Sequence, residues 1–591
     1  MASMMDIENF GDGWKRLLLR EDLENNDCVR KQVTLTALTE IGQEESSIPV
    51  LKQRSYTGTK PVISSPLANT PCAELGTDGF LRKLNELLDT SYSVNTLFSR
   101  NASLKPETPA RQNLTHLSWI LEPYIEQNYD FGTAYAQLRR YWSDVTCMES
   151  NLCTREAADC EMRRKALVGD RINKWNVPPR RVWDLCANRV VPYWVADRDM
   201  PNLDKPTRGR LERPWGISHA WMSDEERADI WTPINGYQWP VPVPKDAKLE
   251  LIRIEMLNLG AEYVWLDVLC LRQAGGQDGH LGIEEWKLDV PTIGWVYRDT
   301  SVMCYFSGLG RPLSLKPGDF ESDRCWFNRA WTLQEISEEA IIGGETGDNS
   351  IMEKEIRAKF QKELESLRLM RKDNSVVDVL RQMQTRVSTN PTDRVAGLAC
   401  LLDSRYIPVY DASQPQEDAW VALVDAMAYW SRTDLFFLYP EPGNGNKYWR
   451  PSWEQMMKKM NFQSCSGLGW LAKVGRTEET NIDWFEGPCI DSGHVRGLDY
   501  EGEGPRQGDL IVGDFNGTRH TFKIFADHQY PIPDGSYILI GTRGWDNETF
   551  WAVGIPRQDG IFEKVSVFSM PDIQQLCALG VVRWAAQMGL C

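Results

Sequence analysis

The stretch that most constrains the fold is EYVWLDVLCL, residues 262–271, which is apolar almost throughout. A strand that water reaches on one side alternates apolar and polar residues, whereas a nearly continuous apolar strand belongs to a sheet covered on both faces. A helical pattern precedes this stretch and ends at Gly260, and an amphipathic pattern with Pro291 inside it follows over 283–297. The alternation of strands and helices predicts an α/β domain with a doubly wound, flavodoxin-like parallel sheet. Its other expected elements are strands over 215–221, 301–306 and 340–344 and a helix over 322–336.

At 591 residues the chain is too long for one hydrophobic core, and its patterns divide it into four regions. Residues 1–178 are expected to be helical, with a mobile segment over 40–78 where Ser, Thr, Pro and Gly accumulate. The α/β domain is predicted over 179–345 and a second helical region over 346–479. Short alternating runs over 480–591 predict a small antiparallel β unit, and DIQQLCALGVVRWAAQMGL predicts a helix that closes the chain.

Charge and composition argue against several classes of protein. The formal net charge is −17 and the sequence has no basic stripe, so we expect no nucleic-acid partner. Nowhere does the sequence hold the roughly 18 consecutive apolar residues of a membrane span, and its start lacks the apolar stretch of a signal peptide. The 14 cysteines are scattered without a CxxC pair, and the six histidines form no HExxH motif. We therefore expect a cytoplasmic protein with reduced thiols and no metal site.

Polar residues at the strand ends are the candidates for a functional site, because ligands of open parallel sheets bind beyond the carboxyl ends of the strands. The first strand ends with Ser218 and His219, followed by Trp221. Asp267 is the one ionisable residue within the apolar stretch, and Arg272 follows it. The helix predicted after the third strand carries Arg329, Trp331 and Glu335.

Each candidate also has a purely structural interpretation. Asp267 could cap a loop or pair with Arg298 or Arg329, because a buried carboxylate needs donors. His219 could be a strand-end histidine bonded to the backbone. Glu335 could lie in water with an exposed ion pair, although the indole of Trp331, four residues earlier on the same helix, would partly desolvate it.

Several segments together resemble the fungal heterokaryon-incompatibility (HET) domain. The likeness rests on RVWDLCANRVVP, WGISHAWMSDEE, YVWLDVLCLRQ and CWFNRAWTLQEI, which follow one another in the family's order and at similar spacing. Downstream, STNPTDRVAGLACLL, IPVYDASQPQEDAWVALVDAM and WRPSW extend the likeness, so that it covers about 181–455. The chain departs from the family at Leu271-Arg272, where an Ile-Asn pair is usual, and at Met222, where a glycine is usual.

HET domains are similar to TIR domains, some of which cleave the nicotinamide–ribose bond of NAD with a glutamate in a WCLxEL-like motif. The segment AWTLQEI resembles that motif and puts Glu335 at the glutamate. The resemblance implies NAD as a substrate, with no cofactor and no metal. It implies a pocket walled by Trp331 and lined opposite by Ser218 and Trp221, with Asp267 ordering the loops.

The resemblance further implies roles for the basic residues and for the whole protein. Arg329 would pair with Asp267 or meet a phosphate, and Arg272 would add positive charge at the mouth of the site. The chain would act in self/non-self recognition that leads to cell death, by NAD hydrolysis. The alternative is a death-signalling module without turnover that acts by self-association or with another incompatibility protein. TIR-like proteins of both kinds exist, so fold alone does not decide between these functions.

Overall fold

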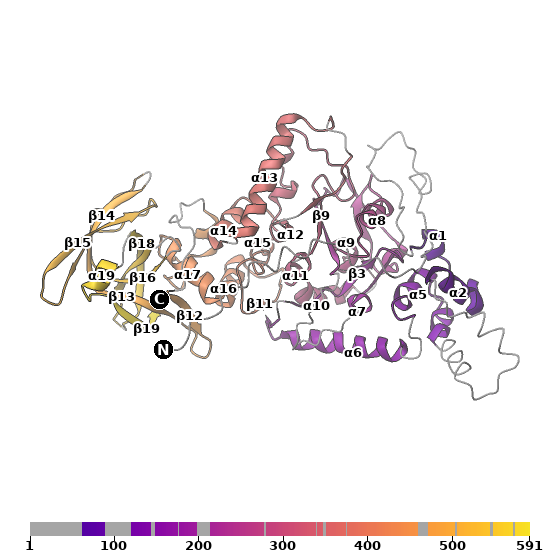
Figure 1. Ribbon diagram of the computed structural model, residues 1–591, viewed down its shortest axis with the longest axis horizontal. Coiled ribbons are helices and arrows are strands. Elements are labelled where there is room, and N and C mark those ends of the chain that lie inside the picture. The colour runs from indigo at the N-terminus through magenta and orange to yellow at the C-terminus, as the bar shows by residue number, and fades with distance from the viewer. Residues whose placement is uncertain are drawn as a thin grey trace, which may run out of the picture. The chain divides into compact units, whose positions relative to one another are not determined.

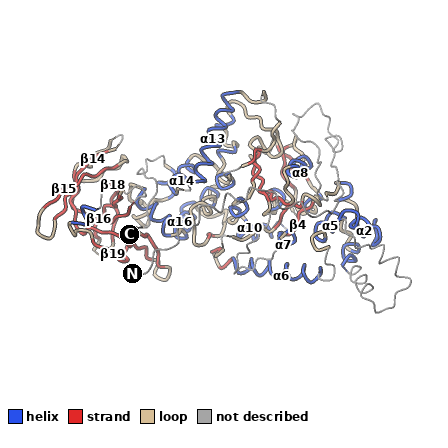
Figure 2. The backbone as a smooth tube through the Cα atoms, viewed as in Figure 1, coloured by secondary structure: helices blue, strands red, loops and turns tan. Residues whose placement is uncertain are grey.

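The structure is a computed structural model in which the described residues form two compact units, one within 62–148 and the other within 149–591. The described residues are 62–88, 120–142, 148–174, 176–197, 213–276, 279–298, 300–337, 340–346, 350–373, 375–458, 471–502, 505–543, 548–558, 560–570 and 574–591. Figure 1 labels the helices and strands, and Figure 2 distinguishes helix, strand and loop along the chain.

The first unit is helical in its described part. It contains α1 (Ser65–Ala68), α2 (Cys72–Leu88) and α5 (Phe131–Leu138). The helical conformation of α2 is interrupted at Gly76, whose φ is 60°. The rings of Phe80 and Phe131 meet edge to face at 5.2 Å between centroids. Of the predicted mobile segment, residues 40–61 lie outside the described part. Residues 65–68 and 72–78 are helical instead, because Ser64 caps α1 and apolar residues such as Ala68 and Cys72 are buried.

The second unit holds a six-stranded sheet in the order β10-β9-β5-β8-β3-β4. Its four parallel strands are β5 (Trp215–His219), β8 (Tyr263–Leu266), β9 (Val302–Tyr305) and β10 (Ile341–Ile342), and β3 (Arg181–Asp184) and β4 (Arg189–Pro192) continue it antiparallel. In chain order the parallel strands therefore lie second, first, third, fourth across the sheet. The predicted mixture of helices and parallel strands is confirmed. Strands β8 and β9 are buried at every position, as their apolar sequences predict.

Three predicted elements differ from those observed. The strand predicted over 262–271 ends at Leu266, and Asp267–Cys270 form the short helix α9. The helix predicted over 283–297 is two helices, α10 (Gly279–Asp289) and α11 (Ile293–Tyr297), with Pro291 in the break. The helix predicted over 322–336 is a 3₁₀ turn, η6 (Trp326–Asn328), followed by α12 (Thr332–Glu335). Between these two turns Arg329 is extended (ψ 137°) and forms a parallel bridge with Val387, a partner that periodicity does not reveal.

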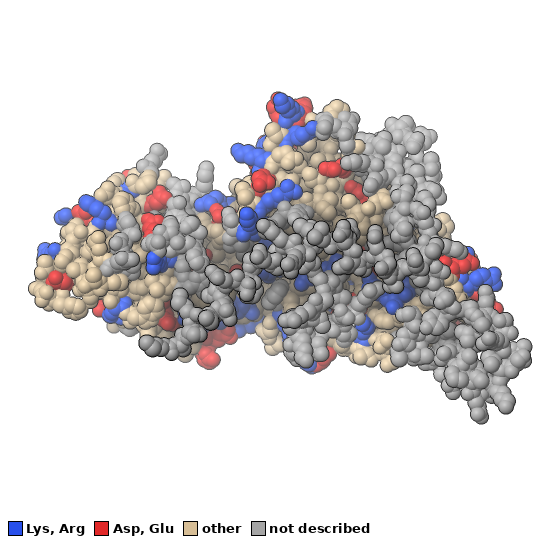
Figure 3. Space-filling model, in the orientation of Figure 1, with Lys and Arg blue, Asp and Glu red and all other residues tan. Residues whose placement is uncertain are grey.

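Helices, turns and two small sheets complete this part of the chain. The three-stranded sheet contains β1 (Leu167–Val168), β2 (Arg171–Ile172) and β11 (Ile407–Pro408), and β6 (Arg227–Ile230) pairs with β7 (Val241–Pro244). Basic and acidic side chains are interspersed on the face shown in Figure 3. The remaining helices and 3₁₀ turns are α6 (Met148–Ala166), α7 (Tyr193–Ala196), η4 (Pro233–Asn235), α8 (Leu249–Asn258), η5 (Asp319–Glu321), α13 (Lys354–Asp373), α14 (Val376–Gln384), α15 (Asp393–Ala396), α16 (Gln416–Ala426), α17 (Tyr429–Leu438) and α18 (Trp453–Met457).

The C-terminal sheet has eight strands and is antiparallel except where β18 meets β19. Its long strand β13 pairs through its first half with β12 and β19 and through its second half with β14 and β16. The apolar side chains enclosed by this sheet include Leu539, Trp551 and Phe568. The strands are β12 (Lys473–Thr477), β13 (Ile482–Arg496), β14 (Arg506–Gly513), β15 (Arg519–Ala526), β16 (Gly535–Arg543), β17 (Thr549–Pro556), β18 (Phe562–Met570) and β19 (Arg583–Leu590).

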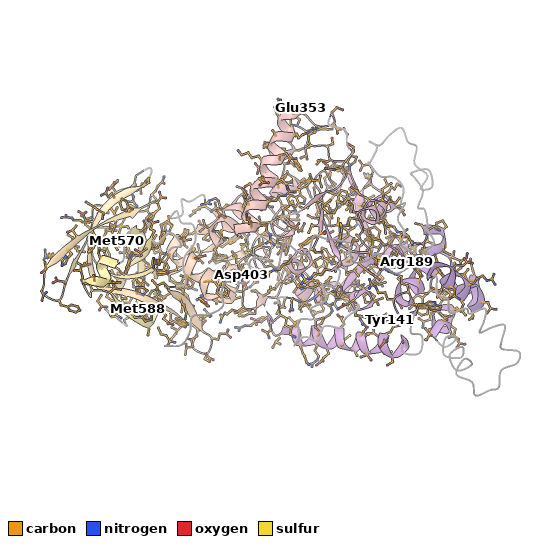
Figure 4. All side chains as sticks on the ribbon, in the orientation of Figure 1. Tyr141, Arg189, Glu353, Asp403, Met570 and Met588 are labelled. Atoms are coloured by element: carbon orange, nitrogen blue, oxygen red, sulfur yellow. The ribbon has the colours of Figure 1, made fainter. Side chains whose placement is uncertain are left out.

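The end of the chain differs from the predicted closing helix. Only α19 (Gln574–Ala578) is helical, and Gly580 then adopts a φ of 67°, which ends the helix. The following residues form β19, on which Figure 4 labels Met588. This segment becomes a strand because β13 offers it a free edge, and Met588 pairs there with Phe485.

Candidate functional site

The candidate site lies at the carboxyl ends of β5 and β8, where the polar residues of the parallel strands gather. Ser218 and His219 end β5, and Asp267 begins α9 directly after β8. The third contribution is α12, which packs against β5 and brings Glu335 to the same rim. Figure 1 labels α12 and β9, and β9 is the neighbour of β5 in the sheet.

Ser218 contacts Glu335 directly, although the two residues are 117 positions apart in the chain. The Ser218 hydroxyl donates to Glu335 Oε2 at 2.5 Å and accepts from the indole Nε1 of Trp326 at 2.8 Å. Ser218 and Trp326 are both buried, at 1% and 0% exposure, whereas Glu335 is only partly buried. The carboxyl group of Glu335 is therefore held by one side-chain donor at the edge of the buried sheet.

The backbone around α12 is held by hydroxyl and guanidinium groups. Thr332 Oγ1 bonds to the carbonyl oxygens of Trp326 and Arg329 at 2.7 and 2.8 Å. Arg386, which is buried, donates to Arg329 O at 2.6 Å and to Thr332 Oγ1 at 2.8 Å. A helix of four residues is not stable by itself, so these bonds and the buried Leu333 keep Glu335 in place.

The surroundings of Glu335 disfavour its ionised form. Burial raises the pKa of this carboxyl to about 7, and the hydrogen bond from Ser218 offsets only part of the effect. The negative charge of Asp267 raises the pKa further, while His219 and Arg386 lower it. Glu335 is consequently a carboxyl group that exchanges its proton near neutral pH.

Asp267 has the donors that a carboxylate in this position needs. Its Oδ1 accepts from the backbone N–H of Val268 at 2.7 Å and lies 2.9 Å from His219 Nε2, and its Oδ2 accepts from Trp221 Nε1 at 3.2 Å. The partner of Asp267 is therefore His219, and the expected pairing with Arg329 is wrong. Three donors hold Asp267 in one orientation at the rim.

His219 bridges the two strand ends. Its Nδ1 lies 3.3 Å from the carbonyl oxygen of Ala220, and its Nε2 faces Asp267. Both ring nitrogens thus face acceptors, an arrangement that suits the doubly protonated ring. Burial opposes the charge, but the Asp267 carboxylate outweighs it, and the pKa of His219 is raised. The ring of Trp221 stacks on His219 at 5.6 Å between centroids.

The other three predicted residues make their direct contacts outside this group. Arg272 is buried over the ring of Trp239, 5.2 Å from its centroid, and its Nε is 3.6 Å from Glu285, so it does not open a charged mouth. Arg329 donates to Thr389 Oγ1 at 3.5 Å.

Trp331 does not wall Glu335, because its ring faces Tyr410 at 6.4 Å between centroids and its indole bonds to Asp393. Tyr410 in turn lines a small hollow. The other residues around that hollow are mostly apolar, namely Pro291, Thr392, Val395, Ala396, Ala399, Ile407, Pro408, Val409, Gln414, Ala419 and Leu423.

The hydrogen bonds that Trp326 and Arg386 make in the site were not predicted from the sequence. Trp326 is buried, and its indole donates to Ser218, a role that was not predicted. A buried indole N–H needs an acceptor, which is the signal that would have pointed to a polar partner. Arg386 follows α14 in a segment without any motif, and no local signal connects it with α12.

Within the described ranges, no cluster of three or more His, Cys, Asp or Glu side chains could hold a metal ion. In the same part of the chain, none of the helices is both long and apolar enough to cross a membrane. In comparisons with known proteins, no family model matches the chain, and no curated protein or solved structure matches it significantly.

Proposed function

We propose that this chain cleaves the nicotinamide–ribose bond of NAD and that Glu335 is its catalytic residue. The observation that carries the proposal is the position of Glu335. Its carboxyl group has a pKa raised to about 7 and lies beside the Asp267–His219 pair at the carboxyl rim of a parallel sheet. Enzymes commonly cleave glycosidic bonds with two carboxyl groups in different surroundings. Here Glu335 is the desolvated carboxyl group, and Asp267 is the one that accepts several hydrogen bonds.

The order of the parallel strands supports a doubly wound, TIR-like fold as part of this proposal. The order β8-β5-β9-β10 corresponds to second, first, third, fourth in the chain, as in flavodoxin-like sheets. In such sheets the ligand site lies between the first and third strands, where the winding reverses. Ser218 ends the first strand, and Glu335 comes from the segment that follows the third.

The proposed chemistry develops positive charge on the ribose. As the bond from C1′ to the nicotinamide nitrogen breaks, nicotinamide leaves with the electron pair and the ribose becomes oxocarbenium-like. The ionised Glu335 stabilises this state by charge and by bonds to the ribose hydroxyls. Water then adds to C1′ and releases one proton, which gives ADP-ribose, nicotinamide and H⁺. Asp267, fixed by three donors, keeps a second negative charge near the developing cation.

The test is release of nicotinamide from NAD by the purified full-length chain, measured by chromatography in dilute and crowded samples. Glu335→Gln should reduce the rate by about 100-fold or more, because it removes the charge and keeps the shape. Glu255→Gln is the matched control. Glu255 is a partly buried carboxyl on α8 that accepts from Tyr305 Oη and Gly344 N, and its loss should leave the rate unchanged. A wild-type chain that leaves NAD intact under all these conditions would refute the proposal.

The second candidate is a death-signalling module without turnover, acting by self-association or with another incompatibility protein. One observation favours it: Trp331 turns toward Tyr410 and Asp393, so the aromatic wall implied for a nicotinamide pocket is missing beside Glu335. On this alternative, expression of the chain in a fungal cell would cause death and Glu335→Gln would cause it equally. Under either function we propose that the chain acts in the cytoplasm in heterokaryon incompatibility.

A further inference from the structure

The Ser218 hydroxyl has a single proton, and its two neighbours determine where that proton points. The indole Nε1–H of Trp326 can only donate, so Ser218 Oγ accepts this bond at 2.8 Å. The Ser218 proton is not used in this bond and can be donated to another acceptor. Glu335 Oε2 lies 2.5 Å from Ser218 Oγ. The indole fixes the direction of the first bond, and the ionised Glu335 carboxylate, which can only accept, fixes the direction of the second.

Cys304 is the other group near the Ser218 hydroxyl. It pairs with Ser218 in the register of β5 and β9. Burial, together with the charge of Glu335, raises the pKa of the Cys304 thiol far above its ordinary value. Cys304 thus stays a neutral thiol, which is a weak acceptor, and does not compete with a carboxylate for the proton.

The indole ring that sets this direction cannot turn. Trp326 is fully buried, and Phe306 and Phe327 meet its ring edge to face at centroid distances of 4.8 and 5.4 Å. Its backbone carbonyl is held by Thr332 Oγ1 at 2.7 Å. A tryptophan confined in this way presents its N–H at one fixed point, the Ser218 oxygen.

We propose that Trp326 is a positioning residue that directs the Ser218 proton onto Glu335 Oε2 and so leaves Glu335 Oε1 for the substrate. The substrate part of this proposal rests on the proposed NAD cleavage, whereas the direction of the hydrogen bonds does not. Ser218, expected from the sequence to line the substrate pocket, instead orients the carboxyl group. Neither Trp326 nor Ser218 needs to touch the substrate.

Other charged and titratable groups face Glu335 and have to be kept unchanged in a test. Each of them interacts electrostatically with Glu335, and they are Asp267 on α9, His219 on β5, Tyr297 on α11, Cys304 on β9, Arg329 before α12 and Arg386 after α14. The variants Ser218→Ala and Trp326→Phe alter none of these groups. A change in the titration of Glu335 in both variants would therefore report the two hydrogen bonds.

The experiment measures the pKa of Glu335 without any turnover. Unfolding free energies of each chain and of its Glu335→Gln counterpart are compared from pH 5 to pH 9. Their difference changes with pH below the folded-state pKa of Glu335 and levels off above it, and the midpoint at which its slope falls to half is that pKa. Loss of a hydrogen bond to a charged group should raise the midpoint by about one unit in Ser218→Ala, and by about half a unit in Trp326→Phe, where the hydroxyl can rotate away. Trp183→Phe is the matched control: it removes a buried indole donor that bonds Asn188 Oδ1 at 3.1 Å, and it should not move the midpoint.

Two further readouts distinguish this proposal from the proposed function. If NAD is cleaved, the rise of the cleavage rate with pH should shift by as much as the pKa of Glu335 does. Trp326→Phe should then be about threefold slower than wild type at pH 6. If NAD is not cleaved but the midpoints shift as expected, NAD cleavage is refuted and the positioning of Glu335 stands. An unchanged midpoint in Ser218→Ala would overturn the positioning itself. Should Trp326→Phe not fold, the Trp326 indole N–H resonance decides: it should move in Ser218→Ala, and a resonance that does not move contradicts the bond.

Discussion

Two carboxyl groups in different regions of this molecule show two ways of burying an acid. Asp483, on β13 of the C-terminal sheet, has a side chain with 0% exposure and contacts Arg432, Lys447 and the indole of Trp449. Burial would raise its pKa, but these cations outweigh that effect and lower it. Glu335, at the rim of the parallel sheet, has one hydroxyl donor, and its pKa is raised to about 7.

The difference indicates what each region is built for. The cations and the indole around Asp483 connect α17, the loop at 447–449 and β13, so that this charge cluster is a structural connection. Glu335 lacks such compensation, and its ionised form therefore costs free energy of folding. A group kept at such a cost is a candidate for function, because stability alone does not favour it.

The largest effect is expected from removing the charge of Asp483. Asp483→Asn leaves the buried Arg432 and the partly buried Lys447 beside a neutral group, and we expect the free energy of unfolding to fall by about 3–5 kcal/mol. Urea unfolding measures the loss. The control is Asp491→Asn on the same strand: its carboxylate is exposed with Arg583 as partner, and the change should cost less than about 1 kcal/mol. Equal losses of unfolding free energy in the two variants would contradict the expected difference between the buried Asp483 and the exposed Asp491.

Neutralising Glu335 should raise the free energy of unfolding, whereas neutralising Asp483 should lower it. The folded-state pKa of about 7 lies above the ordinary value of 4.5, so the wild type loses stability as pH rises from about 4.5 and levels off above 7. Glu335→Gln is free of this loss. It should be more stable than wild type by about 3 kcal/mol at pH 8 and by only about 1 kcal/mol at pH 5. A variant that is less stable than wild type at pH 8 would show that Glu335 is a structural group like Asp483.

The pH dependence of nicotinamide release should follow the same titration if NAD is cleaved. Glu335 acts as the ionised carboxylate, so the rate should rise about tenfold per pH unit up to pH 7 and then level off. Initial rates at saturating NAD, measured between pH 5 and pH 9, give the profile. A rate that stays constant down to pH 5 would mean that the group in use has an ordinary carboxyl pKa.

The smallest effect is expected at Trp331, which faces away from Glu335. Trp331→Phe removes the indole bond to Asp393 but keeps an aromatic ring beside Tyr410, and should lower the free energy of unfolding by about 1 kcal/mol. Nicotinamide release should change less than twofold. A large loss of activity with little loss of stability would instead indicate that Trp331 contacts the substrate, as the family resemblance implies.

Local patterns predicted much of the fold and part of the site. The apolar runs marked β5, β8 and β9, and the strand-end rule selected Ser218 and Asp267 together with His219. Hydrophobic periodicity predicted the wrong element where a segment pairs with a partner that is distant in the chain. The stretch at 322–336 is broken by the bridge from Arg329 to Val387, and the last residues form a strand because β13 has an edge to pair with.

The sequence by itself determined that polar and ionisable residues would follow buried strands. Only the tertiary structure decided that Ser218 meets both Glu335 and Trp326, and that Trp331 turns to Tyr410. The physical reason is that a carboxyl group's charge depends on which donors reach it. Those donors come from segments more than a hundred residues apart, which local periodicity cannot bring together.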